Sequence, residues 1–388
     1  MRKFDYFQPT DIHFGCERVE EVGKVVSRYG NRCLLVTVPV FDAIEDMVKK
    51  VKYNLKKAGI EYVHYDGAIP NPTTEAVAAG TKIAKNFGAD IVLGLGGGSS
   101  IDTAKAVAVE ATHDGSCWDY LFFRETQPTQ KTLPIIAVTT TAGTGSHVTK
   151  VSVISNSTEK RKSAIVNPNL YPKACIVDPL LTLTVPEHIT ASTGFDVFTH
   201  AFEAFIHKNT SPYVELVAKE SIRLLSKYLY IAVCDGSNLE ARTAMSWADT
   251  LAGLSITNAG TTLPHGIGQA ISGYYPHISH GESLAVIYPE FMNFTYESSC
   301  SKFAILAKIL DSNLEGIDNK VAAKESCSLI TDFLKKISMY TSLKDLKVSE
   351  NKLEIIADFS MELPDYLYNP KVATRDDVLE ILKSAYNR

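Results

Sequence analysis

The stretch that decides the fold of the first half is LGLGGGSS, residues 93–100. It continues a predicted strand that begins at Asp90 and whose apolar residues from Ile91 onward are typical of a buried strand. It leads into a helical pattern over 101–110. Glycines let backbone N–H groups approach an anion closely, and a helix N-terminus adds the positive end of a dipole. Gly96, Gly97, Gly98 and Ser99 are therefore candidates for binding phosphate. A structural turn is the alternative, because Ser99 stands where a Gly-x-Gly-x-x-Gly fingerprint has its last glycine.

Strand-like and helical segments alternate around this loop. Apolar runs at 33–38, 61–65, 90–95 and 133–138 predict strands, and amphipathic stretches at 41–58 and 75–87 predict helices. The alternation predicts an α/β domain over residues 1–184, with a doubly wound parallel sheet that binds a dinucleotide. Over residues 185–388 the patterns are helical and longer, so we expect an all-α C-terminal domain.

A second loop, TTTAGTGS at 139–146, follows the fourth predicted strand. Hydroxyl groups such as those of Thr140, Thr141 and Thr144 can bind ribose or phosphate oxygens, although such residues are also common in turns. Ligands of open parallel sheets bind at the carboxyl ends of strands, so the two loops together favour a dinucleotide site. The strand ending at Val38 offers no acidic residue for the ribose of NAD, and Asp42 comes four residues later, so both NAD and NADP stay open.

Composition excludes several classes of protein. The 388 residues carry 39 Lys and Arg against 44 Asp and Glu, with no concentrated basic segment, so we expect no nucleic-acid partner. No apolar run reaches the roughly 18 residues of a membrane-spanning helix. The N-terminus has no apolar stretch typical of a secretory signal, so we expect no membrane partner. The 7 cysteines are scattered without a Cys-x-x-Cys pair, which indicates a reducing, cytoplasmic setting.

The segment GFDVFTHAFEAFIH, residues 194–207, carries a polar stripe on an apolar helical pattern. Asp196 and His200 are four residues apart and so share one face, and Glu203 and His207 continue the stripe. An ordinary amphipathic helix with a solvated polar face fits this spacing equally well. The segment therefore leaves metal binding as one of two interpretations.

Three of the 10 histidines, His265, His277 and His280, lie close together in a mostly apolar segment. A lone buried histidine is usually only hydrogen-bonded in place. Together with the Asp-x-x-x-His helix, however, these residues suggest imidazoles and a carboxylate around a divalent ion. Nitrogen and oxygen ligands of this kind suit Fe²⁺ or Zn²⁺, and no thiolate is available for a structural zinc site.

The combination of motifs resembles the iron-containing (group III) alcohol dehydrogenases over essentially the whole chain. The motifs are IHFG (12–15), DGAIPNPT (66–73), GGGSSIDTAK (96–105), TTAGTGS (140–146), the 194–205 helix and HGESLA (280–285). The resemblance implies reversible hydride transfer between a small primary alcohol or aldehyde and NAD(P). It also implies a divalent metal, Fe²⁺ before Zn²⁺, in a helical domain that binds metal and substrate, and a homodimer.

The family's site residues carry over onto matching positions of this chain. The metal ligands become Asp196, His200, His265 and His280. The coenzyme contacts become Gly97, Gly98, Ser99, Thr140 and Thr144, together with Asp102 and Lys162.

The chain departs from the family pattern at several positions. Gln269 stands where many members have a histidine credited with proton relay, and His147 stands where a glutamate often follows the hydroxyl loop. His280 is one residue farther from His265 than in most members. We therefore treat His277 as a rival ligand or replacement proton carrier. His277 and Asp102 are the two residues that we expect to act in catalysis.

Other functions remain as alternatives. A metal- and NAD-dependent lyase of the dehydroquinate-synthase-like type acts on anionic substrates and needs several Lys or Arg residues in its cleft. The segments around the candidate metal ligands, residues 195–205 and 263–275, contain no Lys or Arg, which favours a small neutral substrate. A metal hydrolase would use only the His and Asp residues, and the glycine loops would have no ligand to bind. A non-catalytic dinucleotide-binding protein would not need a metal site.

Overall fold

The computed structural model describes residues 3–388 and divides the chain into two compact units. The N-terminal unit comprises Phe7–Val185 and Gly236–Ser246. The helical unit comprises Pro186–Asp235 and Trp247–Arg388, together with residues 3–6. Residues 236–246, which the sequence patterns assign to the C-terminal domain, thus belong to the N-terminal unit. There Arg242 donates hydrogen bonds to the carbonyl oxygens of Gly236 and Val185.

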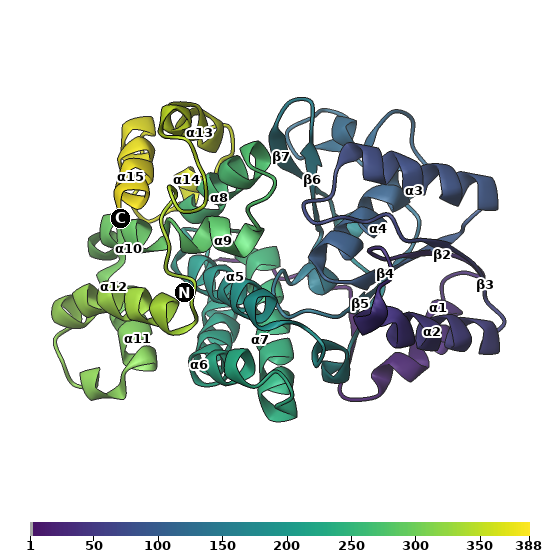
Figure 1. The fold of residues 1–388 in the computed structure, drawn as a ribbon, viewed down its shortest axis with the longest axis horizontal. Coiled ribbons are helices and arrows are strands. Elements are labelled where there is room, and N and C mark those ends of the chain that lie inside the picture. The colour runs from purple at the N-terminus through teal and green to yellow at the C-terminus, as the bar shows by residue number, and fades with distance from the viewer. Residues whose placement is uncertain (1–2) are drawn as a thin grey trace. The chain divides into compact units, whose positions relative to one another are not determined.

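The N-terminal unit is built on a six-stranded sheet whose strands are all parallel (Figure 1). The strand order is β1 (Asp11–Phe14), β8 (Ala174–Val177), β5 (Ile135–Thr139), β4 (Ile91–Gly96), β2 (Arg32–Val36) and β3 (Glu61–Tyr65). This confirms the predicted parallel sheet and its four predicted strands. The sequence patterns missed β1 and β8, and also the antiparallel hairpin of β6 (Val151–Asn156) and β7 (Arg161–Val166).

Helices cover both faces of this sheet, and the strand sequences show why. Neighbouring residues of a strand point to opposite faces. In β2, Leu34 and Val36 belong to one core cluster, whereas Cys33 and Leu35 belong to the other. The first cluster includes residues of α3 (Thr74–Phe87) and α4 (Gly98–Glu110), and the second includes residues of α1 (Val22–Val26) and α2 (Asp42–Lys57). A continuous apolar strand is therefore buried on both sides, as a doubly wound sheet requires.

The helical unit contains no β-strand among the residues that the structure describes there, which confirms the all-α prediction. Its helices are α5 (Glu187–Ile206), α6 (Pro212–Cys234), the later part of α7 (Leu239–Ala259), α8 (Leu263–Tyr274), α9 (His280–Ala285), α10 (Tyr288–Thr295), α11 (Cys300–Leu310), α12 (Asn319–Lys336), α13 (Leu353–Ser360), α14 (Asp365–Tyr368) and α15 (Arg375–Asn387). Within residues 3–388, none of the helices has the length and apolar character needed to cross a membrane.

Helix α5 lies in the core of its unit, and nearly all of its residues are buried. Its aromatic side chains form a packed row, with ring centroids 5.5 Å apart for Phe195 and Phe198 and 5.7 Å apart for Phe198 and Phe202. Tyr288 of α10 and Phe303 of α11 pack against this row. This aromatic row holds one side of α5 in the core of the unit.

Candidate functional site

Three of the four predicted metal ligands, all histidines, converge on a carboxylate oxygen of the fourth, Asp196, in the helical unit. The Nε2 atom of His200 lies 3.7 Å from Oδ1 of Asp196, and the Nε2 atoms of His265 and His280 lie 3.8 Å from the same oxygen. One ligand atom each from Asp196, His265 and His280 lies within 4.8 Å of the other two. Such spacing leaves room for one ion among Asp196, His265 and His280, and the His200 imidazole lies beside the same carboxylate.

Burial separates this cluster from an ordinary solvated helix face. Asp196 is 2% exposed, His200 5% and His265 3%. A carboxylate and several imidazoles are rarely gathered in the interior without a ligand or a compensating charge. The solvated-stripe interpretation of α5 is therefore wrong.

Close helix packing brings the histidines from separate helices to α5. Asp196 and His200 come from α5 itself, His265 from the first turn of α8, and His280 from the first residue of α9. A Cβ atom on Gly281 would lie 2.2 Å from the carbonyl oxygen of Ser192, so only glycine allows α9 to approach α5 this closely. The extra residue between His265 and His280 does not prevent their meeting.

Glu203, one turn beyond His200 on α5, orients His265. Its Oε2 accepts hydrogen bonds from the backbone N–H of Thr262, at 2.7 Å, and from the Thr262 hydroxyl, at 3.2 Å. Because the carboxylate is an acceptor here, Nδ1 of His265, 2.9 Å from Oε1, is the donor. Burial lowers the pKa of His265, but the charge and hydrogen bond of Glu203 outweigh it and raise the pKa above the ordinary value. A carboxylate in this place makes the imidazole a more basic ligand.

The donor set fits a divalent metal. With its proton on Nδ1, His265 presents a lone pair at Nε2, and this buried atom has no hydrogen-bond partner among residues 3–388. A buried acceptor without a partner is unfavourable, and a bound cation would satisfy it. Nitrogen and oxygen ligands suit Fe²⁺ and Zn²⁺. The part of the chain that the structure describes brings no cysteine into this cluster.

Two other histidines lie apart from the cluster. His277 is exposed, and its Nε2 lies 3.1 Å from the carbonyl oxygen of Leu346. His207 ends α5, where its ring stacks on Tyr368 and its Nδ1 accepts a hydrogen bond from the backbone of Asn209. The rival ligand His277 is therefore not among the side chains that the structure brings together.

In the N-terminal unit, the two predicted loops lie in contact at the ends of adjacent strands. The backbone N–H of Thr140 donates to the carbonyl oxygen of Gly96. A Cβ atom on Gly98 would lie 2.4 Å from Cγ2 of Thr144, and one on Gly97 would lie 2.9 Å from Oγ1 of Thr141. Gly96 itself has a φ of +147°, a conformation that favours glycine.

The N-terminus of α4 follows these glycines directly. Gly97 is the N-cap and Gly98 the first helical residue, and no side chain caps the helix. Ser99 is half-buried in this first turn. The exposed N–H groups of such a helix end form an anion-binding site. The predicted phosphate contacts thus lie together in space.

Lys162 and Asp102, the two remaining predicted contacts, are placed differently. Nζ of Lys162, on β7, donates to Oδ1 of Asn71 at 2.8 Å. Asp102 is buried, and its carboxylate accepts hydrogen bonds from the Ser146 hydroxyl at 2.6 Å and from the backbone N–H of Val153 at 3.0 Å. Both oxygens of Asp102 therefore bind groups of the protein itself.

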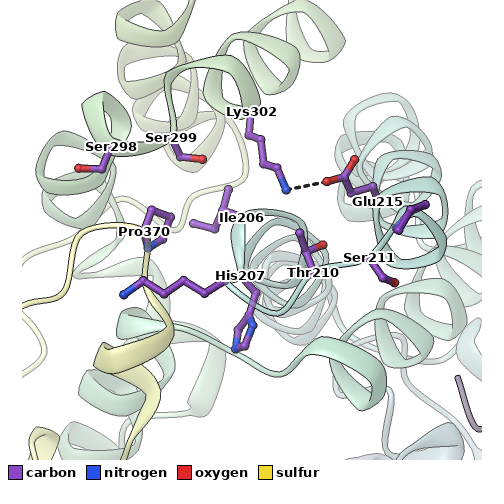
Figure 2. A pocket seen from close by; sticks show the side chains of 11 residues that line it. Ile206, His207, Thr210, Ser211, Glu215, Ser298, Ser299, Lys302 and Pro370 are labelled. Atoms are coloured by element: carbon purple, nitrogen blue, oxygen red, sulfur yellow. Dashed lines mark hydrogen bonds and ion pairs between the residues drawn. The ribbon is translucent and has the colours of Figure 1, made fainter. Parts of the chain in front are cut away.

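A pocket of about 530 Å³ opens at the C-terminal end of α5 (Figure 2). Ile206, His207 and Thr210 line it from the end of α5 and the loop after it. Figure 2 shows Lys302 reaching Glu215 across this pocket, with Nζ 2.8 Å from Oε1. None of the four predicted metal ligands lines this pocket, so we do not assign substrate binding to it.

Sequence reasoning missed two groups that support the site. Glu203 appeared only as part of the polar stripe, although its position one turn after His200 is a signal for a supporting carboxylate. Lys105 lies in the motif GGGSSIDTAK, but an isolated lysine near a helix N-terminus gives no sign that it is buried.

Known proteins match this chain in sequence and structure over both of its units. The family described as iron-containing alcohol dehydrogenase matches residues 9–179, and the C-terminal family of Fe-containing alcohol dehydrogenases matches residues 190–386. A 1,3-propanediol dehydrogenase from Klebsiella pneumoniae is 34% identical over 99% of both chains. An NAD-dependent methanol dehydrogenase from Bacillus methanolicus is 31% identical over 98% of this chain and 99% of its own.

Solved structures agree with these matches. The crystal structure of an archaeal halo-thermophilic alcohol dehydrogenase from a Red Sea brine pool superposes with a TM-score of 0.95. Its identity is 37%, over 99% of this chain and 100% of its own. The buried ligand cluster, the contacting glycine and hydroxyl loops and these matches lead to one conclusion: the chain belongs to the iron-containing alcohol dehydrogenase family.

Proposed function

We propose that this protein is a metal-dependent alcohol dehydrogenase that transfers a hydride reversibly between a small primary alcohol or aldehyde and NAD or NADP. The observation that carries the proposal is the convergence of three imidazoles, two of them buried and that of His280 partly exposed, on Oδ1 of Asp196, with Nε2 of His265 left without a hydrogen-bond partner among residues 3–388. Asp196, His200, His265 and His280 would hold Fe²⁺ or, as the second choice, Zn²⁺.

A divalent ion at this place supplies a positive charge that lowers the pKa of an alcohol hydroxyl and polarises an aldehyde carbonyl. The protein's own residues prepare the site for that chemistry. Glu203 keeps the proton of His265 on Nδ1, so that Nε2 stays available. Thr262 in turn holds Glu203 through two hydrogen bonds. Burial of Asp196, His200 and His265 strengthens the electrostatic interactions among these groups.

The N-terminal unit would hold the coenzyme by its phosphates. We assign this role to the backbone N–H groups at the start of α4, with Gly96, Gly97, Gly98 and Ser99, and to the hydroxyl groups of Thr140, Thr141 and Thr144. Contact between the two loops supports this assignment, because a pyrophosphate needs donors on both sides. Lys162 adds a positive charge beside Asn71.

The character of the metal cluster favours a small neutral substrate. Segments 195–205 and 263–275, which carry most of the ligands, contain no Lys or Arg. An anionic substrate of a lyase would lack cationic partners in these segments. We therefore propose a short-chain primary alcohol and its aldehyde.

The cellular setting and assembly belong to the same proposal. We propose a cytoplasmic setting, which the free thiols of the cysteines support. Strand β1 lies at one edge of the sheet, and a second copy of the chain can add a strand there to form a homodimer. Gel filtration with light scattering tests the dimer directly.

The decisive experiment is a coenzyme-linked assay of protein loaded with Fe²⁺ or Zn²⁺. We expect short primary alcohols to produce NADH or NADPH, and comparing the two establishes the coenzyme preference. Asp196→Asn should lose bound metal and turnover together, whereas Asp332→Asn, at an exposed position on α12, should keep both. Turnover without any net change in reduced coenzyme would indicate the lyase instead. Full activity of a metal-free Asp196→Asn variant would refute the proposal.

A further inference from the structure

Lys105 is a buried cation that the hydride transfer itself does not use. It lies on α4, seven residues after Gly98, and its exposed fraction is 0%. Burying an ammonium group is unfavourable unless hydrogen bonds replace its water. Its bonding partners therefore show what the residue holds in place.

All three protons of the ammonium group have main-chain acceptors from one short segment. Nζ of Lys105 lies 2.7 Å from the carbonyl oxygen of Val151, 2.8 Å from that of Ser146 and 2.9 Å from that of Thr149. The hydroxyl oxygens of Ser146 and Thr149 lie at 3.0 and 3.3 Å. Lys105 thus binds the whole of segment 146–151 rather than one acidic side chain.

Asp102 balances this charge from one turn earlier on α4. The Ser146 hydroxyl donates to Asp102 and accepts from Lys105, so it bridges the two opposite charges. His147 lies beside them, and burial together with the charge of Lys105 lowers its pKa to about 3, so it stays neutral. The ammonium group of Lys105 and the carboxylate of Asp102 thus each have several hydrogen-bond partners, and Ser146 is common to both.

The bound segment begins where the hydroxyl loop ends. The backbone N–H of Ser146 donates to Oγ1 of Thr144 at 3.2 Å, and Gly145 between them has a φ of +61°. Thr144 packs directly on Gly98 of the glycine loop. Fixing Ser146 therefore fixes Thr144 against the first turn of α4.

We propose that Lys105 is a positioning residue for coenzyme binding, which holds segment 144–151 on α4 so that the glycine and hydroxyl loops form one phosphate-binding surface. Lys105 does not touch the coenzyme and acts through Ser146 and Thr144. The inference rests on the proposed function, because it needs a coenzyme in these loops. It predicts an effect on coenzyme affinity and KM, with kcat at saturating coenzyme unchanged.

The test compares Lys105→Met with Lys57→Met in metal-loaded protein. Methionine keeps the length of the side chain and removes its ammonium group, and Lys57 is an exposed lysine of α2 in the same unit. Fluorescence titration with NADH should show a Kd about tenfold or more higher for Lys105→Met, the size of effect expected when a binding loop shifts slightly. Bound metal and kcat at saturating coenzyme should match the unmodified protein, as should every property of Lys57→Met.

Wild-type coenzyme affinity in a folded Lys105→Met variant would overturn the inference and leave the proposed function standing. Failure of the unmodified protein to bind either coenzyme would instead overturn the proposed function, and this inference with it. The two failures are therefore distinguishable.

A pH series on the unmodified protein gives a second test that does not depend on the variant folding. Burial lowers the pKa of Lys105 to about 8, and the charge of Asp102 opposes that shift. The protonated form binds the three carbonyl oxygens, so NADH affinity should fall as the pH rises through this value, by up to about tenfold between pH 7 and pH 9. A Kd that stays constant over this range while the protein remains folded would overturn the inference.

Discussion

Replacing Glu203 by glutamine should weaken metal binding without disrupting the fold. Glu203 accepts hydrogen bonds from Nδ1 of His265 and from both the N–H and the hydroxyl of Thr262. Glutamine has one acceptor oxygen, so it cannot satisfy His265 and Thr262 at the same time. If its NH₂ group faces His265, it favours the tautomer with the proton on Nε2, and that nitrogen can no longer bind a metal.

The expected size of the effect follows from these contacts. A buried donor left without its acceptor costs about 1–3 kcal/mol. Removing the carboxylate behind a metal-binding histidine typically weakens metal affinity about 10–100-fold. The second range corresponds to about 1.4–2.8 kcal/mol, so the two considerations agree.

The assay is competition for Fe²⁺ or Zn²⁺ against a chelator of known affinity, together with thermal unfolding of the apo and metal-loaded forms. The stabilisation by saturating metal should shrink by about 1.4–2.8 kcal/mol in Glu203→Gln. Glu325→Gln is the matched control, because Glu325 is an exposed glutamate of α12 in the same unit. Unchanged metal affinity in a folded Glu203→Gln protein would show that Glu203 does not orient His265.

Three further outcomes are expected. Gly98→Ala places a Cβ atom 2.4 Å from Cγ2 of Thr144, so coenzyme titration should show about tenfold weaker binding. Unchanged coenzyme affinity would argue against contact between the two loops. Phe198→Ala removes a buried ring that packs on Phe202, and urea unfolding should show a free energy of unfolding lower by about 3–5 kcal/mol. A decrease below about 1 kcal/mol would mean that the aromatic row does not support α5. Burial and the nearby Lys208 lower the pKa of His207 from its ordinary 6.5 to about 4, so the unfolded chain takes up this proton first as the pH falls. Lowering the pH from about 7 to about 5 should therefore reduce the free energy of unfolding by about 2 kcal/mol through His207. A His207→Gln variant whose free energy of unfolding falls as much as that of the unmodified protein would contradict this prediction.

Sequence patterns were informative where local chemistry decides the structure. The continuous apolar runs of β2, β4 and β5 predicted buried parallel strands, and each appears close to its expected bounds. The short strands β1 and β8 were missed, because four residues are too few for a periodic pattern, and the sheet pairs each of them with a neighbour far away in sequence. The hairpin of β6 and β7 was missed for a related reason, since polar residues interrupt both strands.

The candidate site shows the same division. Spacing on α5 placed Asp196 and His200 on one face, because i and i+4 side chains are neighbours on any helix. Whether that face meets solvent or the interior depends on what packs against it, and spacing says nothing about that. The close packing of α9 on α5 at Gly281 places His280, and not His277, beside the Asp196 carboxylate. The spacing of these histidines in the sequence could not distinguish between them.

By itself, the chain's order of residues determined a parallel sheet followed by helices, two loops suited to phosphate, and the residue types of a metal site. These features arise from periodicity, backbone freedom and ligand chemistry, all of which act over a few neighbouring residues. Tertiary structure decided which groups are buried, how Glu203 directs the proton of His265, and that Asp102 and Lys105 turn inward to hold segment 146–151. Those outcomes depend on contacts between residues about 40 or more positions apart, which no local pattern contains.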